Sequence, residues 1–169
     1  AKQKCPQLIC VPPHFDMYVE YSRRIFAIYT QYTQRVEPFG IDECWLDVTD
    51  SLKLLGSGEK IAEELRERIK REVGVTVSIG VSFTKVFAKL GSDMKKPDAV
   101  TVISPENFKR KVWGLDASEM LMVGRRTAAK LAKVGIHTIG DLANADVRIL
   151  HQMLGVNGDK LRAEARGEG

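Results

Sequence analysis

The sequence predicts an α+β fold, a sheet with helices on one face followed by a helical tail. Two observations support this prediction. Strand-like and helix-like segments alternate in the first two thirds of the chain, in the order β-α-β-β-α-β-α-β. After Leu115 the β-forming runs cease, and short helical segments joined by glycines follow. We therefore expect one domain over residues 1–115 and a second, helical domain over residues 116–169.

The first elements follow from the spacing of apolar residues. The stretch "PQLICVPP" (6–13) predicts a short strand that ends at its prolines. Apolar residues recur at helical spacing from Phe15 to about Arg35 and predict a long amphipathic helix. Two strands, "RVEPFGI" (35–41) and "CWLDV" (44–48), then read as a hairpin.

Local signals delimit the elements that follow. Ser57 is a candidate N-cap for a helix with an apolar residue at every fourth position, and Gly74 is its predicted end. Pro105 is the predicted start of a short helix. The segments between these two helices are a strand, a helix and a strand: "VTVSIGVS" (75–82), "FTKVFAKLGSDM" (83–94) and "AVTVIS" (99–104).

Composition is typical of a soluble globular protein, with 44% hydrophobic and 28% charged residues. The net charge of +4 mildly favours an anionic partner. Three cysteines without a C-x-x-C pair argue against a disulfide framework or a zinc site and favour a reducing, cytoplasmic location. No apolar run approaches the ~20 residues that a membrane span needs, so no membrane association is expected. Neither end of the sequence reads as a finished element, so we expect an excised piece of a longer protein.

An acidic pair, Asp42 and Glu43, lies between the two strands of the predicted hairpin. A solvated turn is the ordinary explanation of such a pair, but β-forming residues flank it on both sides. Adjacent carboxylates repel each other unless they share a cation. Oxygen ligands favour Mg²⁺ or Mn²⁺ over zinc, so the pair is a candidate site for these ions.

A lysine-containing loop is the second candidate site. Lys96 precedes Pro97 in "KKPDAVTVI", and Lys85 and Lys89 lie four residues apart on the helix before it. A solvated basic face is the usual reading of such a run. The alternative is that Lys96 serves as a compact cation for a triphosphate.

A glycine turn in the helical tail is the third candidate site. Gly124 is followed by Arg125, Arg126, Thr127 and a helix that contains Lys130. This pattern resembles a helix-hairpin-helix, whose backbone N–H groups grip a DNA phosphate without reading sequence. Such hairpins usually carry two glycines, and here Met122 occupies the place of the first. An ordinary pair of helices is the alternative.

Taken in this order, the three motifs resemble the palm and thumb of a Y-family, lesion-bypass DNA polymerase of the bacterial ImpB/MucB/SamB type. The matching stretches are "GIDECWLDVTD", "VSIGVSFTKVFAKLGSDMKKPDAVTVI" and "MVGRRTAAKLAKVGIHTIGDL". The resemblance implies a ferredoxin-like palm followed by a small helix-hairpin-helix thumb. It also implies that Asp42 and Glu43 hold two Mg²⁺ ions with a third aspartate, and that Lys96 contacts the phosphates of the incoming deoxynucleoside triphosphate.

The implied function is template-directed DNA synthesis in translesion repair, as in the SOS response, by a bacterial cytoplasmic, nucleoid-associated enzyme. One metal would activate the primer 3′-oxygen and the other would neutralise the pyrophosphate, about 3.5–4 Å apart. Implied partners are primer-template DNA, held by the hairpin and by Lys85 and Lys89, and a sliding clamp bound through other regions. The family's third aspartate has no match here: Asp16 imitates it by eye but lies at the start of a predicted helix. We therefore expect this chain to be inactive by itself.

Three other functions remain open. An RNA-recognition sheet shares the strand order but needs exposed aromatic residues, which "VTVSIGVS" lacks. A nucleotide cyclase uses paired acids and metal but does not need a DNA-gripping hairpin. A catalytically degenerate polymerase relative would keep the helix-hairpin-helix and only bind DNA.

Overall fold

The computed structural model describes residues 1–168 and divides the chain into two compact units. The first unit is Ala1–Asp47, and the second begins at Val48. This division lies far from the expected boundary at residues 115/116, which marks where strands give way to helices. The boundary at 115/116 stays a prediction. None of the helices in the described chain is both long and apolar enough to cross a membrane.

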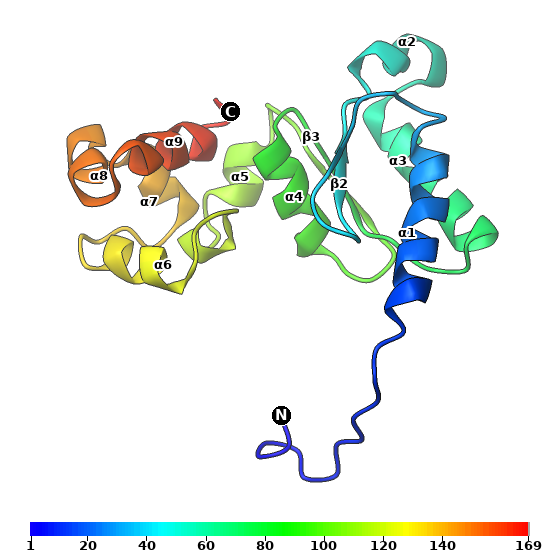
Figure 1. Ribbon diagram of the computed structural model, residues 1–169. Helices are drawn as coiled ribbons and strands as arrows, with labels where there is room; N and C mark the ends of the chain where they lie inside the picture. Colours follow the sequence, from blue (N-terminus) through cyan, green and yellow to red (C-terminus); the bar gives the residue numbers. More distant parts are fainter. Residues whose placement is uncertain (169) are drawn as a thin grey trace. The chain divides into compact units, whose positions relative to one another are not determined.

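The first unit consists of one helix and one hairpin (Figure 1). Its elements are α1 (Phe15–Tyr29), β1 (Val36–Pro38) and β2 (Cys44–Leu46). The strands pair antiparallel with Val36 opposite Leu46 and Pro38 opposite Cys44, so the predicted hairpin is confirmed. The predicted strand over residues 6–13 is wrong: this stretch forms turns and irregular chain, although apolar residues run from Leu8 to Val11. A strand needs a partner for its backbone hydrogen bonds, and none of the described residues pairs with this one.

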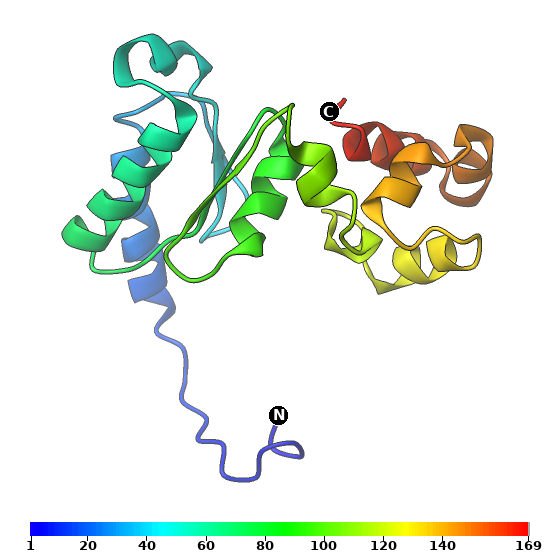
Figure 2. The same ribbon diagram turned by 180° about the vertical axis from the view of Figure 1, so that it is seen from behind.

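The second unit begins with alternating helices and strands (Figures 1 and 2). Its first elements are η1 (Thr49–Ser51), α2 (Leu52–Leu55), α3 (Gly58–Glu72), β3 (Ile79–Ser82), α4 (Lys85–Met94), β4 (Val100–Ile103) and α5 (Phe108–Val112). Ser57 caps α3 as predicted, with its hydroxyl accepting from the N–H of Lys60. Gly74 follows the helix with a φ of +81°, which only glycine adopts readily. The start predicted at Pro105 is wrong, because α5 begins after its N-cap, Asn107.

Strands β3 and β4 pair in parallel, with Ile79 opposite Val100. The described strands form two separate two-stranded sheets rather than the single sheet expected. Helix α4 packs directly on Gly80, where an added Cβ would lie 1.8 Å from the carbonyl oxygen of Ala88. Val81 points to the opposite face of the strand, because neighbouring side chains alternate. There a Cβ at Gly58, the first residue of α3, would lie 3.0 Å from Val81 Cγ1.

The expected arrangement with helices on one face is therefore wrong for this strand pair. α4 lies on one face and the start of α3 on the other. The apolar pattern of β3 fits this arrangement, since none of its four residues is exposed.

Helices alone fill the rest of the second unit (Figures 1 and 2). They are η2 (Ala117–Glu119), α6 (Arg125–Ala132), α7 (Ile139–Asn144), α8 (Val147–Leu154) and α9 (Val156–Ala165). As predicted, residues 116–168 contain no strand; Asp116 and Thr138 form only an isolated bridge. One hydrophobic core runs from Val86 in α4 to Ala165 in α9, so these helices and the α4–β4 region share an interior.

Candidate functional site

The acidic pair lies in the connection between β1 and β2. Asp42 is exposed in a bend, and Glu43 is half-buried immediately before β2. The N–H of Phe39 donates to the carbonyl oxygen of Glu43 at 2.8 Å, which closes the turn. Gly40 permits the turn with a φ of +92°. The ordinary turn residue was therefore present in the sequence, two positions before the acids.

Two contacts within the first unit hold this turn in place. The hydroxyl of Ser22 in α1 donates to the carbonyl oxygen of Ile41, the residue before Asp42. The rings of Phe39 and Trp45 pack across the hairpin with centroids 4.9 Å apart. The acids therefore project from a turn that is braced by a helix and by an aromatic pair, although the sequence pointed to neither contact.

The cysteine beside the acidic pair, Cys44, is half-buried. Burial raises the pKa of the Cys44 thiol to about 11, so the thiol stays protonated. Burial also raises the pKa of Tyr29, whose side chain shares a hydrogen bond with Cys44. All three cysteines are free.

Carboxylate oxygens suit the hard cations Mg²⁺ and Mn²⁺, so Asp42 and Glu43 fit as partial ligands. Within residues 1–168, no three or more Asp, Glu, His or Cys side chains gather into a metal-binding group. Asp16 lies in the first turn of α1, in agreement with the prediction that it is a helical residue.

The second candidate site is built around Asp93, which the sequence analysis missed. Lys96 Nζ lies 2.7 Å from Asp93 Oδ1, and Lys89 Nζ lies 2.9 Å from Asp93 Oδ2. Burial raises the pKa of Asp93, but hydrogen bonds from Lys96 and Lys89 outweigh it and hold the pKa below its usual value. The structure thus brings Lys89 and Lys96 together on one carboxylate. Lys85 lies at the exposed first position of α4.

The third candidate site is the turn before α6. Gly124 is the N-cap of α6 and makes no side-chain cap. Of the residues after it, Arg125 and Arg126 are exposed and Thr127 is half-buried. Lys130 is exposed one turn further along. The N–H groups of a first helical turn have no partner within the helix, so they are available to an anion at this end.

The backbone of this turn explains the departure from a two-glycine hairpin. Met122 has a φ of +69°, in the left-handed region that favours glycine, and the residue is 77% exposed. Gly124, in contrast, has a φ of −75°, and a Cβ there would meet no atom within 4 Å. The turn therefore has the glycine-like conformation at residue 122, and it does not itself require glycine at residue 124.

Comparisons with known proteins show which family the chain matches. A model of the impB/mucB/samB family matches residues 1–93. DNA polymerase IV of Acetivibrio thermocellus is 56% identical over 167 residues, and DNA polymerase IV 1 of Bacillus subtilis is 42% identical over the same length. These alignments cover 99% of this chain but 42% and 40% of the two relatives. The chain thus spans less than half the length of these relatives.

Solved structures show the same agreement. DinB from Sulfolobus solfataricus superposes with a TM-score of 0.87 and 27% identity, over 99% of this chain and 50% of that one. An insertion ternary complex of Dbh DNA polymerase superposes with a TM-score of 0.88, also at 27% identity and over 99% of this chain.

Proposed function

The chain belongs to the impB/mucB/samB family, and we propose on this premise that it is the palm and thumb of a Y-family translesion DNA polymerase. The observation that carries the proposal is the 56% identity to a DNA polymerase IV over 99% of the chain. The structural match to a polymerase solved as an insertion ternary complex supports it. In this proposal residues 1–115 belong to a ferredoxin-like palm and residues 116–169 form the thumb.

The acidic pair is the proposed metal site of the palm. Asp42 and Glu43 present carboxylates from a braced turn, and a third carboxylate from another part of the protein would complete the set. Divalent cations, Mg²⁺ by preference, supply Lewis acidity for phosphoryl transfer when bound there. The brace from Ser22 holds the backbone at Ile41, directly before the two acids, and so limits where their carboxylates can reach.

Lys96 is the proposed contact to the phosphates of the incoming nucleotide. Its ammonium now lies on Asp93, so it must exchange this carboxylate for a phosphate when a nucleotide binds. Lysine serves such a role as a compact, mobile point charge. Asp93 keeps the ammonium near its working position in the meantime.

The turn before α6 is the proposed DNA contact of the thumb. Arg125 and Arg126 are exposed in the first turn of α6, where the backbone N–H groups have no partner within the helix, and Lys130 is exposed in its last turn. Such a site binds the DNA backbone without reading bases. Lys85 and Lys89 in α4 are further candidates, and a sliding clamp and a bacterial cytoplasmic location remain part of the proposal.

Fluorescence anisotropy with a primer-template duplex tests the DNA contact. We expect binding no tighter than roughly micromolar at physiological salt, with a log–log salt slope of about −0.9 per neutralised phosphate. Alanine at Arg125, Arg126 and Lys130 should weaken binding for every sequence and flatten this slope. The matched control replaces three exposed cations elsewhere in the second unit by alanine, Lys53, Lys60 and Arg71.

A glycine variant separates the backbone contact from the charge. Gly124→Ala should fold normally, because its φ is ordinary and its Cβ meets open space. If backbone N–H groups approach a phosphate closely, the added methyl group should still weaken DNA binding. Unchanged affinity and salt slope in the triple alanine variant would contradict the thumb assignment and move the DNA contact to Lys85 and Lys89.

A further inference from the structure

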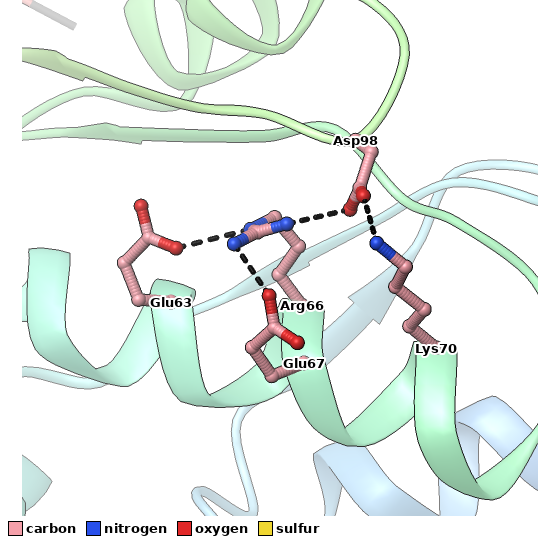
Figure 3. Close-up of polar contacts among 5 residues, drawn as sticks. All are labelled: Glu63, Arg66, Glu67, Lys70 and Asp98. Carbon is pink, nitrogen blue, oxygen red and sulfur yellow. Dashed lines mark hydrogen bonds and ion pairs between the residues drawn. The ribbon is translucent and has the colours of Figure 1, made fainter.

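Asp98 is bound by two cations that project from α3 (Figure 3). Arg66 Nη1 donates to Asp98 Oδ1 at 2.7 Å, and Lys70 Nζ donates to Asp98 Oδ2 at 2.6 Å. Arg66 is itself oriented by Glu63 at 3.0 Å and Glu67 at 2.6 Å. Each oxygen of the Asp98 carboxylate therefore has its own cationic partner.

These contacts join segments that are far apart in the chain. Arg66 and Lys70 precede Asp98 by 32 and 28 residues. Asp98 lies in the loop between α4 and β4, immediately before Ala99, whose carbonyl oxygen accepts from the N–H of Ile79 at 2.9 Å. The two ion pairs thus tie the end of this loop to α3, at the point where the loop enters the parallel strand pair.

The backbone of Asp98 also requires such support. Its φ is +56°, in the left-handed region that side-chain-bearing residues adopt at a cost. Aspartate tolerates this region better than most residues, and here both of its oxygens are engaged. A conformation of this kind persists where surrounding contacts over-determine it.

Lys96 lies two residues before this anchor. On the other side of the loop its ammonium pairs with Asp93 in α4. The short segment Lys96–Asp98 is therefore held from α4 at one end and from α3 at the other. A lysine reaches a phosphate as a point charge on a flexible stem, so the position of its Cα limits where the charge can go.

Exposed ion pairs contribute little to stability, so the ordinary explanation of such pairs is an incidental surface contact without a role. The side chains of Arg66 and Asp98 are only 18% and 20% exposed, however, and they share one network with Lys70. We propose that Arg66 and Lys70 are positioning residues, which hold Asp98 and thereby set the place from which Lys96 reaches nucleotide phosphates. This inference rests on the proposed function for the role of Lys96.

NMR spectroscopy of this chain tests the anchor and its consequence separately. Backbone ¹⁵N relaxation at residues 95, 96, 98 and 99 reports the order of the loop. Titration with dATP and Mg²⁺ reports nucleotide affinity. The variants are the double change Arg66→Gln and Lys70→Gln, the change Asp98→Gly, and the control Arg71→Gln. Arg71 belongs to the same stretch of α3 but pairs with Glu72 instead of Asp98.

We expect order parameters of about 0.85 in the wild type and the control, and below about 0.6 in the double variant and in Asp98→Gly. The dissociation constant for dATP should rise about tenfold in both altered forms, equivalent to a lost contact. The double variant removes two positive charges near Lys96, whereas Asp98→Gly removes one negative charge. Glycine also adopts the positive φ at residue 98 without strain. Positioning predicts weaker binding in both. A pure charge effect predicts that Asp98→Gly binds the anion more tightly.

An ordered loop with unchanged affinity in the double variant would overturn the inference, and so would tighter binding in Asp98→Gly. Lys96→Ala distinguishes failure of the proposed function. If dATP binds this variant as it binds the wild type, or binds neither, the nucleotide role of Lys96 is wrong. The relaxation data then still decide whether Arg66 and Lys70 anchor the loop.

Discussion

The hydroxyl of Ser22 donates a hydrogen bond to the carbonyl oxygen of Ile41, which directly precedes the acidic pair. The two residues are 19 positions apart, and the bond ties α1 to the turn of the hairpin. It acts on the backbone rather than on a carboxylate. Ser22 can therefore fix the position of the backbone from which the side chains of Asp42 and Glu43 extend.

Ser22→Ala should loosen this turn. Loss of a hydrogen bond costs about 1 kcal/mol, whereas alanine favours a helix over serine by about 0.5 kcal/mol, so overall stability should change little. Amide exchange at Phe39, whose N–H bonds to Glu43, should accelerate instead. Ser22→Thr keeps the hydroxyl and should retain the slow exchange. Equal exchange in the wild type and the alanine variant would show that the bond does not brace the hairpin.

Met122→Gly should stabilise the chain. A residue with a side chain in the left-handed conformation costs about 1–2 kcal/mol, and the extra freedom of glycine in the unfolded state costs about 0.5–1 kcal/mol. Because the side chain is largely exposed, little packing is lost. We expect a net gain of about 0.5–1 kcal/mol in urea denaturation. Met122→Ala retains the strain and serves as the control; a glycine variant no more stable than the alanine variant would contradict this reading of the turn.

Stability should fall in acid partly through Asp98. Hydrogen bonds from Lys70 and then Arg66 hold the pKa of this carboxyl below its usual value. The folded chain therefore binds the proton more weakly than the unfolded chain, whose aspartate pKa is about 3.9. The contribution to stability is complete above that pH and is lost as the pH falls through the lower, folded pKa.

The measurement is urea unfolding of the wild type and of Asp98→Asn from about pH 5 downward. Asparagine keeps the left-handed backbone accessible but does not titrate. The wild type should lose stability more steeply than the variant as the pH falls. Parallel curves would show that the pairs with Arg66 and Lys70 contribute nothing in solution.

Features with a local cause were predictable from the sequence. Ser57 marks the start of α3 and Gly74 marks its end. Both signals can be found in the sequence because a cap and a positive φ each act within one turn of chain. The hairpin also follows from local patterning. The predicted strand over residues 6–13 failed because apolar β-formers do not create a partner strand. Likewise, the apolar pattern of β3 shows that both faces are covered but not by which helix.

The candidate site shows the same limit. The pairing of Lys89 with Asp93 could be predicted from the sequence, since residues four apart share a helical face. The contact between Arg66 and Asp98 could not be predicted, because it spans 32 residues and depends on how α3 packs against the strand pair. The left-handed backbone of Met122 could be read only with the glycine pattern of the family as a guide.

The most direct test of the central claim is primer extension by a chimera. This chain would replace the matching 167-residue stretch of the Acetivibrio thermocellus DNA polymerase IV, with which it shares 56% identity. With Mg²⁺ and all four deoxynucleoside triphosphates, the chimera should extend a primer, while the isolated chain should not. Asp42→Asn or Glu43→Gln in the chimera should reduce extension by several orders of magnitude without loss of folding, as judged by circular dichroism. Extension that survives both substitutions would contradict the assignment of these two carboxylates to the metal site of a polymerase. Clear extension by the isolated chain would mean either that Asp16 supplies the third carboxylate or that the site is misassigned.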